Sequence, residues 1–117
     1  MPKVNVMKST ILVAGIGLMI LFATGCAKLK SRDALNHGVQ AYKGAHYTEA
    51  VDYFKSAVQL DPDNMMPRLY LATAYMSQYI PGAESPENMQ LAKQAKEEFS
   101  KVLEAHPKDT TALASLA

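Results

Sequence analysis

The sequence contains no tryptophan, a single cysteine and no long run of charge of one sign. One cysteine, Cys26, cannot form a disulfide within the chain, so cysteine usage does not indicate a redox compartment. The net charge of +1 offers no basic patch for nucleic acid. The sequence has no glycine-rich phosphate loop and no nucleophile–base pair, and its histidines, His37, His46 and His106, lack ligand partners at metal-binding spacing. These absences predict a protein that is not an enzyme, uses no cofactor or metal, and does not bind nucleic acid.

Apolar residues are concentrated at the N-terminus. Residues 1–8 carry Lys3 and Lys8 and no acid, residues 11–23 carry no charge, and small residues lead to Gly25 and Cys26. A basic start, a short apolar core and a small-residue end are typical of a secretory signal peptide. The pattern predicts a signal peptide over residues 1–25. Its removal takes away two lysines and leaves ten basic against eleven acidic residues.

The glycine–cysteine end of this segment resembles the lipobox of bacterial lipoproteins, although Ala23 stands where leucine is commonest in that family. The resemblance implies that Cys26 carries diacylglycerol after cleavage, and that residues 26–30 tether the rest to a membrane. The chain would then face the periplasm or the exterior. The alternative is a signal anchor in the inner membrane, because residues 9–27 hold no charge and are about long enough to span a bilayer. Both interpretations predict a membrane-bound protein of a bacterial cell envelope.

Two apolar-periodic segments follow, with a break at residues 44–46. Leu35, Gly38, Val39 and Tyr42 recur at the spacing of one helical face, which predicts a helix over residues 31–43. Thr48 is the expected N-cap of a second helix, which ends before a proline. The apolar stripe of this second helix consists of Ala50, Tyr53, Phe54, Ala57 and Val58.

The pattern returns further along the chain. The two prolines that close the copies are 45 positions apart, and residues 79–86 have the composition of a loop, so the second copy contains an insertion at about residues 77–87. Ser85 and Pro86 look like an N-cap and a first-turn proline. We expect the segment from Gln78 to Glu84 to be the most mobile part of the repeats. The matching residues are Ala50, Phe54 and Pro62 in the first copy and Ala95, Phe99 and Pro107 in the second.

This pattern resembles the tetratricopeptide repeat, a helix–turn–helix unit of 34 residues. The resemblance implies an all-α fold in which hairpins stack as a short right-handed solenoid. Repeat 1 would cover residues 31–64, repeat 2 residues 65–109, and residues 110–117 would begin a truncated repeat 3. Arg68 departs from the pattern, which usually has an aromatic residue there. The packing residues implied by the pattern are Gly38, Ala50, Phe54, Ala57, Pro62, Ala72, Tyr75, Ala95, Phe99 and Pro107.

The resemblance also implies a concave groove that binds a segment of another protein. Such a groove would belong to a membrane-tethered scaffold for protein–protein interaction, including the assembly of envelope complexes. Aliphatic residues replace the charged residues with which some of these domains clamp a C-terminal carboxylate. Two alternatives remain open, namely the non-catalytic N-terminal part of a larger envelope enzyme or transport subunit, and a structural module that self-associates through its open C-terminal end. The groove residues are Leu35, Val39, Tyr42, Leu69, Thr73 and Met76.

Overall fold

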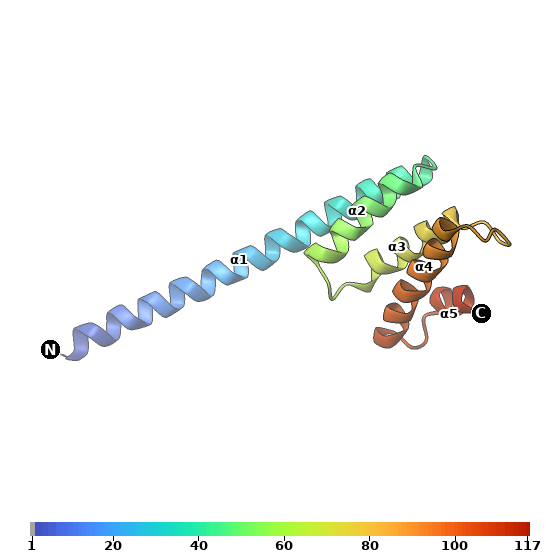
Figure 1. The fold of residues 1–117 in the computed structure, drawn as a ribbon. Coiled ribbons are helices and arrows are strands. Elements are labelled where there is room, and N and C mark those ends of the chain that lie inside the picture. Colours follow the sequence, from blue (N-terminus) through green and yellow to red (C-terminus); the bar gives the residue numbers. More distant parts are fainter. Residues whose placement is uncertain (1) are drawn as a thin grey trace.

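The computed structural model describes the backbone of residues 2–117 and the side chains of residues 23–117. This part of the chain forms five helices and no strand: α1 (Pro2–Lys43), α2 (Tyr47–Leu60), α3 (Met65–Gln78), α4 (Pro86–Ala105) and α5 (Thr110–Leu116). α1 pairs with α2, α3 pairs with α4, and the two hairpins meet through α2 and α3 (Figure 1). α5 packs against α4. The stack of hairpins confirms the expected all-α fold class.

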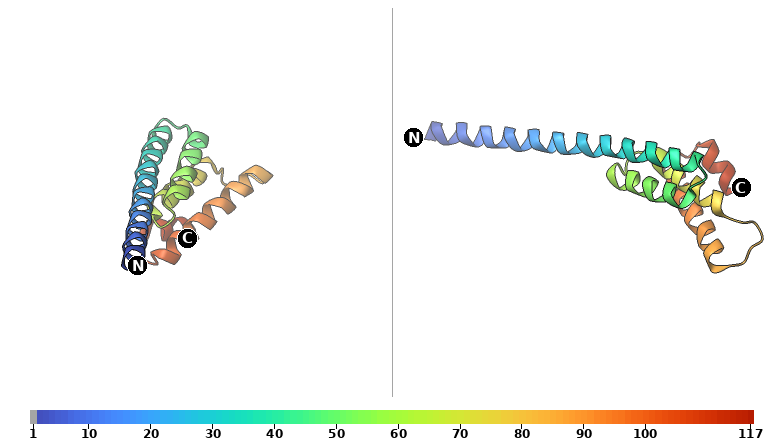
Figure 2. Two further views of the ribbon diagram at one scale, coloured as in Figure 1. Left: turned by 90° about the vertical axis from the view of Figure 1, so that its left-hand side faces the viewer. Right: turned by 90° about the horizontal axis from the view of Figure 1, so that it is seen from above.

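α1 is one continuous helix, and its N-terminal part projects far beyond the bundle (Figure 2), so the molecule is 78 Å long. Residues 26–30, expected as a tether before a new helix, lie within α1. They include alanine, leucine and lysine, which favour helix, and no proline. The predicted signal peptide lies almost entirely outside the described side chains and stays a prediction. Among residues 23–117, whose side chains are described, no helix is long and apolar enough to cross a membrane.

The core forms where small residues let the helices approach closely. Phe54 is fully buried, and a Cβ placed on Gly38 would lie 2.5 Å and 2.6 Å from two atoms of its ring. This contact explains why α1 carries a glycine that costs helix stability elsewhere. The fully or almost fully buried apolar side chains include Ala50, Phe54, Ala57, Pro67, Leu71, Ala72, Ala74, Tyr75, Ala95, Phe99, Val102 and Ala112.

The first hairpin turns within residues 44–46. The N–H of His46 donates to the carbonyl of Ala41 at 2.9 Å, and Ala45 adopts a φ of +61° between them. α2 begins at Tyr47 without a side-chain cap, so the expected N-cap role of Thr48 is wrong. The Thr48 hydroxyl instead donates to the side-chain oxygen of Gln78 at 3.4 Å. The turn is closed by backbone hydrogen bonds rather than by a capping side chain.

The later helices do use side-chain caps. Asn64 accepts from the Met66 N–H at 3.1 Å at the start of α3, and Asp109 accepts from the Ala112 N–H at 2.9 Å at the start of α5. Ser85 caps α4, and Pro86 occupies its first turn, as the sequence predicts. Each bond satisfies an N–H that lacks a partner within its helix.

In each hairpin a polar contact that the repeat pattern did not predict joins the two helices. The buried Ser31 hydroxyl donates to the Ala57 carbonyl at 2.7 Å, which joins α1 to α2. Arg68 pairs with Glu98 at 2.9 Å, which joins α3 to α4, and Lys101 contacts the other oxygen of Glu98 at 3.0 Å. Arg68 thus replaces an aromatic contact with an ion pair.

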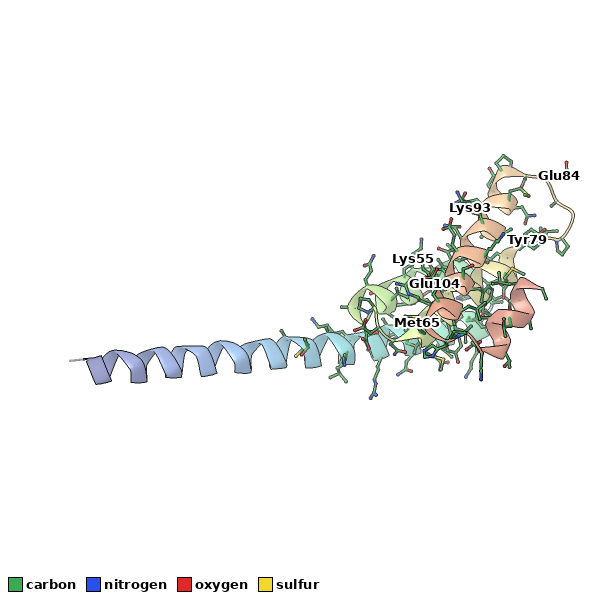
Figure 3. All side chains as sticks on the ribbon, turned by 90° about the horizontal axis from the view of Figure 1, so that it is seen from below. Lys55, Met65, Tyr79, Glu84, Lys93 and Glu104 are labelled. Carbon is green, nitrogen blue, oxygen red and sulfur yellow. The ribbon has the colours of Figure 1, made fainter. Side chains whose placement is uncertain are left out.

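The two hairpins end in different connections. Three residues separate α1 from α2, whereas the α3–α4 connection covers residues 79–85, within the range expected for the insertion. The longer connection projects from the bundle, with Glu84 at its outer part (Figure 3).

Candidate functional site

The predicted groove residues on α1 are half-buried against the core. Leu35, Val39 and Tyr42 pack against the buried cluster that both hairpins share. The Tyr42 hydroxyl forms a hydrogen bond of 2.8 Å with the Ser77 hydroxyl of α3. On this helix the structure places the predicted residues where they support the stacking of the second hairpin.

The outward face of α3 is more open. Thr73 and Leu69 are half-buried, and the Thr73 hydroxyl donates to the Leu69 carbonyl at 2.8 Å. Met76 is 38% exposed. Two further apolar residues at helical spacing share this face, Met66 at 50% exposure and Tyr70 at 37%. Neither was among the predicted groove residues, although their spacing from Thr73 could have indicated them.

Tyr70 is held in place on this face. Its ring stacks on that of Phe54, with centroids 5.5 Å apart and an angle of 25° between the ring planes. The ring therefore covers part of the core with one side and remains partly exposed. A rigid aromatic side chain of this kind loses little entropy when it contacts a partner. We call the outward side of this helix the α3 face, which consists of Met66, Leu69, Tyr70, Thr73 and Met76.

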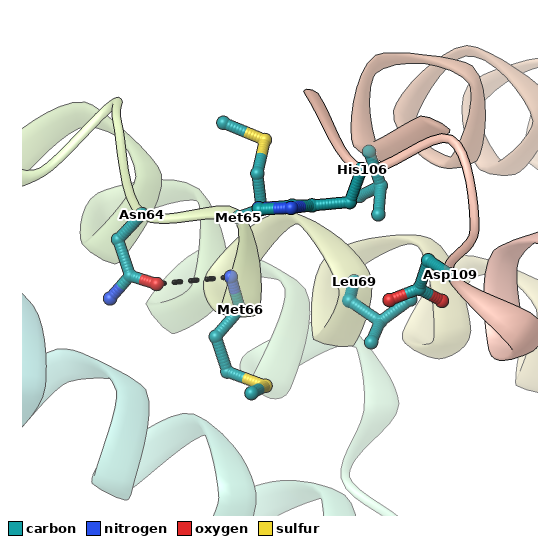
Figure 4. Close-up of a pocket in the computed structure, with 7 residues that line it drawn as sticks. Asn64, Met65, Met66, Leu69, His106 and Asp109 are labelled. Carbon is teal, nitrogen blue, oxygen red and sulfur yellow. Dashed lines mark hydrogen bonds between the residues drawn. The ribbon is translucent and has the colours of Figure 1, made fainter. Parts of the chain in front are cut away.

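A pocket of about 310 Å³ lies at the start of α3, between this helix and the end of α4 (Figure 4). Its apolar part includes Met66 and Leu69, so the pocket continues the α3 face. Val102 contributes an almost fully buried side chain. The volume is at the lower end of the range for small-ligand pockets, which suits one large apolar side chain of a partner better than a cofactor. The lining residues are Asn64, Met65, Met66, Leu69, Val102, His106 and Asp109.

The fold can now be compared with known proteins. No protein-family model matches the sequence, and no curated protein matches it. Among solved structures, the TPR domain of Arabidopsis OM64 matches with a TM-score of 0.63 and 20% sequence identity. The chain has a tetratricopeptide-repeat-like (TPR-like) fold. The match covers 76% of this chain but only 64% of that one, and identity at this level establishes the fold alone.

The TPR-like arrangement places the pattern residues in two environments. Pro62 and Pro107 are exposed just after the ends of α2 and α4. A proline there cannot continue the helix, which is its role at a helix end. The other eight residues are buried at the contacts within and between the hairpins: Gly38, Ala50, Phe54, Ala57, Ala72, Tyr75, Ala95 and Phe99.

Histidines of the TPR-like region meet acids in single pairs, His37 with Asp33 and His46 with Glu49. In the part of the chain with described side chains, no group of three histidine, cysteine or acidic residues could hold a metal ion. His37 stacks on Tyr53 with ring centroids 5.4 Å apart and lies 3.7 Å from Asp33. His106 is the C-cap of α4 and borders the pocket.

Cys26, the expected point of lipid attachment, lies in α1 before that helix meets α2. Its thiol is free and its side chain exposed. The neighbouring residues 23–30 are also exposed except for Ala27, which is half-buried. A lipid chain on this sulfur would therefore meet no packed side chain of the TPR-like bundle.

Proposed function

We propose that this protein is a membrane-tethered TPR scaffold that binds segments of other proteins in a bacterial cell envelope, including during assembly of envelope complexes. The observation that carries the proposal is the α3 face, where Met66, Tyr70 and Met76 remain exposed and a partly apolar pocket opens at the Met66 end. Covering apolar surface contributes roughly 25 cal/mol per Å², so a partner segment that covers these side chains would gain binding energy.

The chemistry of this face indicates the kind of segment that it binds. Its side chains are apolar or neutral, and its two methionines can adapt their shape to a partner. An amphipathic helix or extended segment with large apolar residues at helical spacing suits such a surface. Leu35 and Val39 occupy positions where a carboxylate clamp would have charged residues, so recognition of an acidic chain end is not proposed.

The tether in this proposal is a diacylglycerol chain on Cys26. It is supported by the basic, apolar and small-residue order that ends at Gly25 and Cys26, and by the exposure of the thiol. More than one acyl chain is needed for durable anchoring, and processing of this type supplies a second site at the new N-terminal amine. The alternative tether, an uncleaved apolar anchor, would retain Met1 and an unmodified cysteine.

Tethering is tested by replacing the lipid acceptor. Cys26→Ser should leave the precursor uncleaved, because the modified sulfur is required before cleavage. Mass spectrometry of membrane-extracted wild-type protein should show a diacylated Cys26 at the N-terminus, and the variant should retain residues 1–25. An intact Met1 and a bare thiol in the wild-type protein would contradict the lipoprotein assignment and favour the signal anchor.

Binding through the α3 face is tested with two exposed residues whose substitution should not disturb the core. The double variant Met66→Glu, Met76→Glu places charge on both ends of the face. Lys96→Glu, an exposed change on α4, is the matched control. Proteins cross-linked to the lipidated full-length chain should be lost in the double variant and retained in the control. Equal recovery from both variants would show that the α3 face is not the binding surface.

A second candidate function, self-association, is favoured by α5. Ala112 is buried, whereas Leu113 is 48% and Leu116 37% exposed on the same short helix. Two copies could cover these leucines by packing their α5 helices together. Sedimentation of the purified protein should then show a dimer that Leu113→Glu dissociates. A monomer at all accessible concentrations would eliminate this candidate and leave the scaffold proposal unaffected.

A further inference from the structure

The α3–α4 connection is fixed by one side chain, that of Asn88 in the first turn of α4. Its oxygen accepts from the Ile80 N–H at 2.7 Å, and its nitrogen donates to the Ile80 carbonyl at 2.8 Å and the Ala83 carbonyl at 2.7 Å. Asn88 is only 5% exposed. The side-chain amide thus holds two separate points of the loop backbone, in a segment that the sequence led us to expect as mobile.

These bonds define the shape of the loop without burying its largest apolar residue. Ile80 is 64% exposed although its own N–H and carbonyl are both bound by Asn88. Gly82 adopts a φ of +82°, which glycine tolerates, and completes the bend. An isoleucine in this position contributes little to the core. The loop is therefore built to display Ile80 in a fixed position rather than to pack it.

The surroundings of the displayed isoleucine are apolar and acidic. Met76 in the last turn of α3 and Met89 in the first turn of α4 are 38% and 55% exposed. Glu84 and Glu87 are also exposed, and the sequence from residue 79 to residue 91 contains no basic residue. Figure 3 shows Glu84 on the part of the loop that projects from the bundle. We call residues 79–85 with Met76, Glu87 and Met89 the loop surface.

We propose that the loop surface is a second docking site, in which Ile80 contacts a large apolar residue flanked by lysine or arginine in a segment of a partner protein. Fixing the loop before binding lowers the entropy cost of association. The acidic side chains of the loop surface complement a basic segment and would select against an acidic one. Met76 is shared with the α3 face, but the pocket and Met66 lie at the other end of α3. Binding at Ile80 therefore does not require the Met66 end of the α3 face.

The test uses the full-length protein in detergent and a displayed library of random twelve-residue peptides. Clones retained on the wild-type protein but not on Ile80→Asp should share a large apolar residue next to lysine or arginine. A labelled consensus peptide then measures affinity by fluorescence anisotropy. We expect Ile80→Asp to weaken binding at least about tenfold, as for the central residue of an interface. The double variant Glu84→Gln, Glu87→Gln should weaken binding and remove most of its salt dependence.

Two variants test whether peptide binding requires the loop conformation that Asn88 holds. Asn88→Asp keeps the shape of the side chain and its acceptor but loses both donations, so the peptide should bind more weakly while circular dichroism shows the same helix content. Met66→Glu, at the other end of α3, should leave the affinity for this peptide unchanged. Unchanged affinity in Asn88→Asp would overturn the role of the fixed loop.

Other outcomes would assign the loop surface differently and overturn the proposal. If no clone depends on Ile80, or the enriched clones carry no basic residue, the loop surface does not recognise the proposed kind of partner. Anionic vesicles that bind the purified protein only when Ile80 is intact would assign the surface to a membrane. A dimer that dissociates in Ile80→Asp would assign it to a second copy of the chain.

Discussion

The two hairpins share their apolar packing residues but are held together by different additional contacts. Phe54 and Phe99 occupy equivalent buried positions. The first hairpin adds a close contact at Gly38, a three-residue turn and the hydroxyl of Ser31. The second adds the Arg68–Glu98 pair and a longer loop fixed by an amide side chain.

The comparison shows which parts of the repeat pattern determine the fold. Gly38 and Ala72 are 34 positions apart, one repeat length, and both are buried. Small residues and the aromatic ring beside them set the helix crossing in both hairpins. The remaining contacts can be apolar or ionic, and the connection can be short or long. The second hairpin uses that freedom to display a loop, which the first does not.

The largest effects are expected from the shared aromatic residues. Phe54→Ala and Phe99→Ala should each lower the free energy of unfolding by about 3–5 kcal/mol, because both rings are buried and leave cavities. Urea unfolding followed by circular dichroism measures this loss. Similar losses in both variants support equivalent roles. A loss below about 1 kcal/mol in one variant would show that its hairpin relies on other contacts.

A smaller effect is expected from the ion pair that joins α3 to α4 in the second hairpin. Glu98→Ala leaves the Arg68 side chain, 19% exposed, without its partner and should cost about 1–3 kcal/mol. Lys101→Ala is the control, since this lysine is 49% exposed and contacts the same carboxylate, and should cost less than about 1 kcal/mol. Thermal unfolding at two salt concentrations compares them. Equal effects would place the stabilisation in the exposed pair instead.

The third effect tests the close contact in the first hairpin. Gly38→Ala should destabilise by about 1–2 kcal/mol, because overpacking costs about 1–3 kcal/mol and helix propensity returns up to about 1. The added Cβ would meet the fully buried Phe54 ring. Gly44→Ala is the control, where an added Cβ would lie 3.5 Å from the Ala41 carbonyl oxygen, an ordinary contact distance. Combining Gly38→Ala with Phe54→Leu should recover part of the loss, and strict additivity would contradict the contact.

The sequence predicted the fold because the repeat pattern depends on local periodicity and small residues. The spacing of Ala50, Phe54 and Pro62, and its return in the second copy, was enough to place both hairpins. The sequence pattern did not predict the polar contacts between individual side chains. Nothing in the sequence links Arg68 to Glu98 or Ser31 to Ala57, because each pair is distant along the chain and meets only after the helices pack.

The candidate site was predicted less completely than the fold. The sequence predicted that faces of both α1 and α3 would bind a partner, but the two faces differ in exposure. Leu35 on α1 packs against the core, whereas Met66 on α3 is exposed. Exposure depends on which neighbour covers a helix, and the sequence of one helix does not contain that information. The role of Asn88 was missed for a similar reason. An asparagine in a first helical turn is common, and only the folded loop shows what its amide binds.

The smallest effect is expected at Ser31, where α1 leaves the bundle. Ser31→Ala removes the donor to the Ala57 carbonyl but leaves that carbonyl bonded to the Asp61 N–H at 3.1 Å. No buried acceptor loses its last partner, so the cost should be about 0.5–1 kcal/mol, the low end for a hydrogen bond. Ser56→Ala, an exposed change on α2, controls for the loss of a hydroxyl.

The measurement is urea unfolding of both serine variants, with hydrogen exchange to locate the effect. Faster exchange in Ser31→Ala should be confined to the last turn of α2 and the adjoining part of α1, where the two helices first meet. The backbone amides of the second hairpin should exchange as in the wild-type protein, because other contacts, including the Arg68–Glu98 pair, join its two helices. A loss above about 2 kcal/mol, or faster exchange throughout the second hairpin, would mean that this single bond couples the two hairpins.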